Sequence, residues 1–521
     1  MLFSPLERDH HGNCCNDVLA AADLKDRIRQ SHRPWPRSST VSAQAPLRSR
    51  RQRCRKLQQR KPSRSPDGGC EMTVIDSMDL KSLRGDHIQV QLLHPERSRQ
   101  RRHETTVITG QNGSHKSTLL KQIVERLGPL GPSAEPSDAQ KTGVDLAGSS
   151  LLCVSGSLAD RFPQKELSSG ARTKYDVPNY MYVGQRVMNN LLSRKAPLET
   201  VLGFALTPEK AERFQWNFFY QAHAHAGIEP VVEYQLTARD HRRQPDLDLR
   251  DALEALTPEA DKDRSASRKA LYVSYAKAQW LLETFTRDDF EKLQNFLLAG
   301  RRSAYLKLSS DGVSGSLHEP NVLRLGLLLD VLGLGTVKVR STRTHETFSA
   351  FELSSGEYHM FLTMLAIGFG VEKETVVLMD EPENNLHPQW QRDLMASVFE
   401  VFSQVESEGH IIISTHSPLI VGSAPEGSSV VDLTDDEPST TVVSYGASSD
   451  ELLLTQFGVG SSRNKIVVDT IQRAVSLVER GNFRNPDFLA LAPDLRAIRD
   501  ALTREDPMID VIDALLDEGQ E

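Results

Sequence analysis

The chain has 521 residues, of which 38% are hydrophobic and 25% are charged, a composition typical of a globular protein. Its longest apolar stretches, such as Asn321 to Gly335, are interrupted by charged residues. They stay short of the roughly 18 apolar residues that a membrane-spanning helix needs. We therefore expect a protein that does not span a membrane and works in the cytoplasm.

The net charge of −8 is unevenly distributed along the chain. Residues 1–71 contain 15 Lys and Arg against 7 Asp and Glu, so they carry +8 and the remaining residues carry −16. The acidic character of residues 72–521 excludes a broad surface that binds nucleic acid. Any contact with nucleic acid would need a local patch or a partner protein. Residues 1–71 are predicted to be a disordered basic extension, or to precede a true start at Met72. Their basic run could be a nucleic-acid arm or a solvated tail.

The cysteines indicate a reducing compartment. Only Cys153 lies outside residues 1–71, which hold Cys14, Cys15, Cys54 and Cys70. This spacing fits neither a disulfide framework nor a zinc site.

From Met72 onward, apolar segments indicate strands that alternate with helices. We expect a helix at Ser117–Leu127 and strands at Val90–Leu93, Thr105–Thr109, Leu151–Ser155, Tyr180–Val183, Thr375–Met379 and His410–Ser414. Residues 191–345 are mostly helical in pattern, with a charged, loop-like interruption near Arg239 to Arg268. From Ala447 the pattern is helical to the end. The order predicts an α/β domain that is split by a helical insertion.

A glycine-rich loop follows the second of these strands, at Gly110–Thr118 (GQNGSHKST). Glycines let successive backbone N–H groups face a phosphate, and the helix that follows adds the partial positive charge of its N-terminus. Lys116 would reach the β- and γ-phosphates, and the Ser117 hydroxyl would bind Mg²⁺. His115 stands where a glycine normally precedes the lysine, which could weaken the approach of the phosphate. The candidate phosphate-binding residues are Gly110, Asn112, Gly113, Ser114, His115, Lys116, Ser117 and Thr118.

Two carboxylates follow the apolar run Val376–Met379, which fits a strand buried on both faces of a parallel sheet. The carboxyl end of such a strand is where α/β sheets bind ligands. Asp380 would hold Mg²⁺, directly or through water, and Glu381 would orient and deprotonate the attacking water.

Two further motifs have both a structural and a functional interpretation. Ser354, Ser355 and Gly356 open an apolar helix, where they could form a simple cap with a nearby glutamate or a second anion cradle. His416 follows the apolar strand Ile411–Ser414 and could hydrogen-bond the γ-phosphate or the attacking water.

In the order phosphate loop, serine–glycine motif, acidic strand and histidine strand, the chain resembles the ABC-type P-loop ATPase head, from about Met72 to Tyr445. The resemblance implies a mixed sheet and a pair of heads that sandwich two ATP molecules with Mg²⁺. It implies Walker B roles for Asp380 and Glu381, a switch role for His416, and contact of Ser354–Gly356 with ATP bound to the opposite copy. Gln185 and Gln164 both remain candidates for the Q-loop residue.

The segment Glu383–Gln391, with Leu386-His387-Pro388, resembles AAA-family ATPases of the overcoming-lysogenization-defect and RecF-related branch. Three further features resemble the PtuA ATPases of Septu and retron-associated antiphage systems: Ser155–Pro163 with Tyr180–Arg186, Trp390, and Leu452–Asn464. This resemblance implies a partner, typically an HNH-type nuclease or another effector. Asp435-Asp436-Glu437 is interpreted as a solvated loop, so we expect no Toprim nuclease site.

We therefore expect a cytoplasmic, Mg²⁺-dependent ATPase subunit of an antiphage complex that forms dimers or higher oligomers and controls a separate nuclease. Two alternatives stay open: a RecF- or SMC-like DNA-repair ATPase, and an assembly scaffold that binds ATP but barely hydrolyses it. A transporter ATPase fits less well. The expected organisation is an extension (1–71), an ATPase N-terminal part (72–190), a helical insertion (191–345), an ATPase C-terminal part (346–446) and a helical tail (447–521).

Overall fold

The computed structural model describes residues 74–81, 85, 87–97, 102–127, 150–164, 175–187, 191–207, 217–239, 248–257, 271, 273–299, 303–372, 374–405, 408–435, 437–443, 465–479, 486–502 and 506–518. The predicted extension 1–71 lies outside these residues. The chain divides into one unit, Met72–Phe457, and a second that contains Gly458–Glu521. The domain boundaries expected from the sequence remain predictions.

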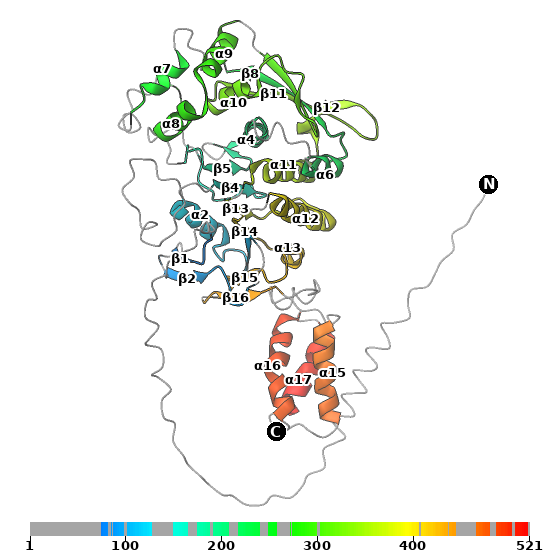
Figure 1. Ribbon diagram of the computed structural model, residues 1–521. Coiled ribbons are helices and arrows are strands. Elements are labelled where there is room, and N and C mark those ends of the chain that lie inside the picture. The colour runs from blue at the N-terminus through cyan, green and yellow to red at the C-terminus, as the bar shows by residue number, and fades with distance from the viewer. Residues whose placement is uncertain are drawn as a thin grey trace, which may run out of the picture. The chain divides into compact units, whose positions relative to one another are not determined.

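A seven-stranded sheet forms the centre of the first unit (Figure 1). Its order is β16 (Ser439–Val442), β15 (Ser429–Asp432), β3 (Glu104–Thr109), β14 (His410–Ser414), β13 (Thr375–Asp380), β4 (Ser150–Ser155) and β5 (Tyr180–Val183). Neighbouring strands are parallel, except that β16 pairs antiparallel with β15. The fold is therefore the predicted α/β fold with a mixed sheet.

Helices cover both faces of this sheet, which explains why its central strands β3, β14 and β13 are buried along their whole length. On β13, Val376 and Leu378 pack in one hydrophobic cluster with α2 (Lys116–Leu127). Val377 and Met379 pack in another cluster with α11 (Ser355–Gly370) and α12 (Pro388–Gln404). The hairpin of β1 (Ser77–Lys81) and β2 (His87–Gln91) lies on the α2 side. The strands expected in this part of the chain are confirmed, except that β2 ends at Gln91 and so includes only the first half of the strand expected at Val90–Leu93.

The prediction that residues 191–345 are mostly helical is wrong in part. The region does contain α4 (Lys195–Ala205), α6 (Asn217–His225), α7 (Leu249–Glu254), α8 (Tyr275–Thr284), α9 (Arg287–Leu298) and α10 (Pro320–Leu328). It also supplies four strands of a five-stranded antiparallel sheet, in the order β10 (Gly312–Ser314), β9 (Ser303–Ser309), β8 (Val231–Ala238), β11 (Leu332–Arg340) and β12 (Thr347–Ser349).

The physical reason is a two-residue alternation that the sequence carries. In β8, Val232, Tyr234 and Leu236 are buried, whereas the residues between them face outward. This is the pattern of a sheet with one covered face. The loop expected near Arg239 to Arg268 contains α7, and residues 240–247 and 258–270 lie outside the described residues.

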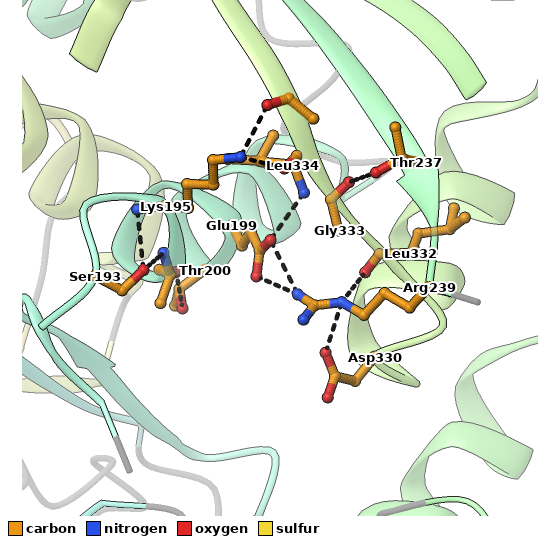
Figure 2. Close-up of polar contacts among 12 residues, drawn as sticks. Ser193, Lys195, Glu199, Thr200, Thr237, Arg239, Asp330, Leu332, Gly333 and Leu334 are labelled. Carbon is orange, nitrogen blue, oxygen red and sulfur yellow. Dashed lines mark hydrogen bonds and ion pairs between the residues drawn. The ribbon is translucent and has the colours of Figure 1, made fainter. Parts of the chain in front are cut away.

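A polar cluster joins α4 to this second sheet (Figure 2). Arg239, just after β8, donates to both carboxylate oxygens of Glu199 on α4, at 3.0 and 2.8 Å, and pairs with Asp330 at 3.2 Å. Glu199 also accepts a hydrogen bond from the Leu334 amide of β11 at 2.8 Å. Charge-assisted bonds therefore join the second sheet to α4 within the insertion.

The N-terminal end of α4 is in turn fastened to the chain before α11. The Arg194 guanidinium, which precedes α4, donates to the carbonyls of Phe351, at 2.7 Å, and Leu353, at 3.1 Å. It also stacks over the Tyr358 ring, 4.2 Å from its centroid.

The second unit contains three described helices, α15 (Lys465–Glu479), α16 (Pro486–Ala501) and α17 (Pro507–Glu518), as the C-terminal pattern predicts. Their buried side chains include Ile471, Leu495 and Ile512. In the described part of the chain, no helix has the length and apolar character to cross a membrane.

Candidate functional site

The glycine-rich loop connects β3 to α2, as expected. Gly110 and Gly113 have φ values of 142° and 87°, which glycine adopts at low cost. A Cβ on Gly113 would meet no atom within 4 Å, so the backbone there is open to a ligand. The buried Ser114 hydroxyl has no hydrogen-bond partner among the described residues. These features fit a phosphate cradle.

His115 keeps the loop in the shape that a glycine would give it. Its φ is 70°, in the left-handed region, directly before α2 begins at Lys116. For a residue with a Cβ this conformation costs about 1–2 kcal/mol. Histidine in place of the usual glycine therefore strains the backbone locally but does not change the conformation of the loop.

Lys116 lies inside the loop with 5% of its surface exposed. Its ammonium donates to the carbonyls of Gly110, at 2.9 Å, and Gln111, at 3.1 Å. Burial lowers the pKa of Lys116, against the opposing effect of the Glu381 and Asp380 carboxylates. A phosphate would be a stronger partner than two neutral carbonyls because both groups would then be charged.

Asp380 ends β13 beside the first turn of α2. Its Oδ1 accepts a hydrogen bond from the Ser117 hydroxyl at 3.1 Å and another from Ser414, the residue paired with it on β14. Burial raises the pKa of Asp380 to about 6, and the neighbouring Glu381 acts in the same direction.

The adjacent hydroxyl and carboxylate are hard oxygen donors of the kind that Mg²⁺ prefers. Within the described residues no group of three or more His, Cys, Asp or Glu could hold a metal. A Mg²⁺ ion would therefore need Ser117, Asp380 and the phosphates of a bound nucleotide. The sequence did not single out Ser414, whose role depends on strand register.

Glu381 follows in a left-handed conformation, with φ 49°. Its amide donates to the Ser414 carbonyl at 3.0 Å, and its Oε2 accepts from the Asn384 side chain at 2.7 Å. The His416 Nε2 lies 3.9 Å from Glu381 Oε1. Burial lowers the pKa of His416, and the charge of Lys116 lowers it further, so the imidazole is neutral near pH 7. The structure thus brings together the two predicted catalytic residues.

Glu383 is a residue of the site that the sequence motifs did not identify. Its Oε1 accepts from the Thr415 hydroxyl and from the His416 amide, both at 2.7 Å. Burial raises the pKa of Glu383. The side chain fixes the segment that carries His416 against the loop after β13. A signal was present in the second glutamate of Asp380–Glu383 (DEPE), although its spacing alone assigns no role.

Arg161 is a second such residue. Its guanidinium donates to the Thr118 hydroxyl of the phosphate loop at 3.0 Å. Because Arg161 follows β4, far from the loop in sequence, no local motif indicated this contact.

Ser354, Ser355 and Gly356 form the start of α11. Ser354 caps α11: its hydroxyl accepts from the Glu357 amide at 3.3 Å, and Glu357 accepts from the Ser354 amide at 2.9 Å. Within one chain the motif is therefore a helix cap, as the structural interpretation of the sequence predicted. Ser354 and Ser355 are exposed, and no described hydrogen bond joins them to the phosphate loop.

Neither Q-loop candidate ends β4, which pairs with β13 on the side opposite β14. The last residue of β4, Ser155, pairs with Asp380. Gln164 donates to the Arg186 carbonyl at 2.8 Å, and Gln185 follows β5, one strand further away. The assignment stays open.

Residues 236–422 match one family model. Its description is "AAA domain, putative AbiEii toxin, Type IV TA system". The matched segment contains the serine–glycine motif, the acidic strand and His416, and it leaves out the phosphate loop. Among curated proteins, none matches the chain in sequence.

Solved structures with some similarity include the Smc head domain of Pyrococcus furiosus bound to the C-terminal domain of ScpA. It is 13% identical, with 71% of this chain and 96% of that chain covered and a TM-score of 0.28. An ATP-binding cassette of an ABC transporter in its ADP conformation is 13% identical, with 74% and 90% covered and a TM-score of 0.22. UvrA2 of Deinococcus radiodurans is 15% identical, with 67% and 33% covered and a TM-score of 0.21. Similarities this low carry no argument, so the fold rests on the strand order and loop described above.

Proposed function

We propose that the chain is a Mg²⁺-dependent ATPase subunit whose nucleotide site is completed by a second copy. The observation that carries this proposal is the convergence of Lys116, Ser117, Asp380, Glu381 and His416 at the carboxyl ends of β3, β13 and β14. A phosphate-binding lysine, a magnesium pair and a candidate base then meet at one edge of one sheet.

Each residue has a role that its surroundings support. Lys116 binds the β- and γ-phosphates in place of its own loop carbonyls. Ser117 and Asp380 hold Mg²⁺, which supplies charge neutralisation at the phosphates. Glu381, fixed by Asn384 and close to a neutral His416, orients the attacking water and takes its proton.

The exposed serines at the start of α11 support a role in trans. The N-terminus of a helix binds anions, and Ser355 makes no described contact with the phosphate loop of its own chain. A second copy placed head-to-tail would bring Ser354–Gly356 onto the bound triphosphate.

At the finer level, we propose a cytoplasmic antiphage complex in which the paired heads control a separate effector nuclease. The resemblance of Ser155–Pro163, Trp390 and Leu452–Asn464 to PtuA ATPases supports this role. Co-purification of the tagged protein with its neighbours in the cell tests it, and recovery of an HNH-type nuclease is the expected result. Stimulation of ATP hydrolysis by DNA, with no nuclease recovered, would favour a repair ATPase.

Hydrolysis is tested by comparing wild type with Glu381→Gln and Lys116→Ala. We expect Glu381→Gln to bind ATP with wild-type affinity and to hydrolyse it about 100-fold more slowly or worse. Lys116→Ala should lose ATP binding. Equal turnover of wild type and Glu381→Gln would leave the scaffold alternative, which the strained His115 also favours.

Pairing is tested by light scattering on Glu381→Gln with and without ATP. We expect ATP to convert monomers into dimers or higher oligomers. Ser355→Arg should prevent this conversion and leave ATP binding by the monomer intact. ATP-independent behaviour of both proteins would refute the sandwich.

A further inference from the structure

The loop that follows Glu381 is held from two sides. On one side, Glu383 binds the segment of Thr415 and His416. On the other side lies α11, whose His359 donates from Nε2 to the Pro382 carbonyl at 2.9 Å. The backbone next to the candidate base therefore depends on a helix that starts with the serine–glycine motif.

The contact of His359 is fully enclosed. Only 4% of its surface is exposed, and burial lowers its pKa, so the ring is neutral. Because the Pro382 carbonyl can only accept, the proton must be on Nε2. Loss of this donor would leave a buried carbonyl without a partner.

Gly156 shows how little space surrounds this contact. A Cβ there would lie 2.2 Å from the Glu381 carbonyl oxygen and 3.1 Å from both Cε1 and Nε2 of the His359 ring. The Gly156 amide donates to the Asp380 carbonyl at 2.9 Å. His359, Gly156 and Glu381 are thus packed so closely that a shift of one requires a shift of another.

The same helix face carries the exposed serine. Ser355 and His359 are four residues apart and therefore neighbours along α11. Directly after Ser355, a Cβ on Gly356 would lie 2.5 Å from the carbonyl oxygen of Asn385, in the same loop as Glu381. Asn385 also has a left-handed φ of 64°. The N-terminal part of α11 therefore contacts this loop at two points, His359 and Gly356.

We propose that His359 is a positioning residue that couples binding of Ser355 to the partner's nucleotide with the position of Glu381 in its own chain. The inference rests on the proposed function, since it requires a nucleotide site shared by two copies. The inference specifies which copy is controlled by which nucleotide. Each copy senses its partner's nucleotide through α11 and adjusts its own rate of hydrolysis.

The test uses pairs with a single live site. One copy carries Glu381→Gln, so it binds ATP but does not hydrolyse it at a normal rate, and its partner is otherwise wild type; two affinity tags isolate the mixed pair. His359→Leu is placed either in the copy that hydrolyses ATP (in cis) or in the Glu381→Gln copy (in trans). In cis we expect kcat to fall about 10- to 100-fold, with KM within twofold. In trans we expect the rate to stay within twofold, because that copy supplies only its serines.

Two further variants make the result specific. His359→Gln can place an amide N–H where Nε2 lies, so it should recover most of the rate in cis. Gly156→Ala disturbs the same contact from the opposite side and should reproduce the loss in cis. It also replaces His359→Leu if that variant does not fold.

Three results would overturn the proposal: equal losses in cis and in trans, a loss confined to trans, or no loss with His359→Leu and Gly156→Ala. The first two would show that His359 only supports the serine motif. Failure of the proposed function itself is recognised separately, because the wild-type pair would then neither form with ATP nor hydrolyse it. That result would remove the inference as well.

Discussion

His410 begins β14 in the middle of the central sheet and has no exposed surface. Its Nδ1 accepts from the Ile75 amide at 3.3 Å, and its Nε2 lies 2.9 Å from the Thr106 hydroxyl. That hydroxyl donates to the Leu92 carbonyl, so it must accept from the imidazole Nε2–H. A second proton on Nδ1 would face an N–H donor.

Protonation of His410 therefore opposes folding. Burial lowers the pKa of His410 to about 3, and the charges of Arg97 and His103 act in the same direction. In the unfolded chain the pKa is about 6.5, so the unfolded state binds more protons once the pH falls below that value. The contribution of the neutral His410 to the free energy of unfolding is fully present above about pH 6.5. It is lost as the pH falls toward 3. Between pH 7 and pH 5 the loss is about 2 kcal/mol, almost independent of the exact folded pKa.

The assay is urea unfolding at a series of pH values between 5 and 7, with wild type and His410→Gln. The variant is less stable throughout, so the comparison uses the slope of the free energy of unfolding against pH. Near pH 5.5 we expect the wild-type slope to exceed that of the variant by about 1.2 kcal/mol per pH unit. Asp380, whose pKa is raised, makes a contribution of opposite sign to this slope. The contribution is the same in both proteins, so it cancels when the two slopes are subtracted.

Parallel curves for wild type and His410→Gln would refute the argument, since they would mean that His410 takes up its proton equally in both states.

Substitutions of His115, Arg239 and Gly409 test three separate features. His115→Val places a β-branched residue at φ 70°, so we expect a lower melting temperature and weaker ATP binding, whereas His115→Gly should bind ATP at least as tightly as wild type. Arg239→Met removes the bidentate partner of the partly exposed Glu199 and should lower the free energy of urea unfolding by about 1 kcal/mol, with part of the loss recovered by adding Glu199→Gln. Gly409→Ala would put a Cβ 1.9 Å from the Thr375 carbonyl oxygen, between β13 and β14, and should cost about 2 kcal/mol or more in the same assay.

The central sheet could be predicted because its strands are buried on both faces. Val376–Met379 and Ile411–Ile413 are apolar throughout, and a short apolar run between turns indicates such a strand. The second sheet has one open face, so Glu233 and Lys307 stand among its apolar residues and pair across β8 and β9. Such alternation is easily confused with amphipathic helices when both occur in one region.

The site residues also divide into those that could be predicted from the sequence and those that could not. Lys116 and Asp380 belong to local motifs whose chemistry depends on a strand end and a loop, and both lie as expected. Glu383 and His359 act through tertiary contacts with segments distant in sequence. No spacing rule specifies which backbone group a buried imidazole will meet, so neither role could be predicted.

The position of β14 determines when this site can exist. β3, which leads into the phosphate loop, and β13, which carries the acidic pair, are not neighbours; β14 lies between them. During synthesis, β3 and β13 leave the ribosome before residues 410–414 emerge. Until then the edge of each strand that will pair with β14 is unpaired, so it can pair incorrectly or bind a chaperone. Formation of the proposed ATP site is therefore a late event in the synthesis of each chain, and we expect a chain interrupted before β14 not to bind nucleotide.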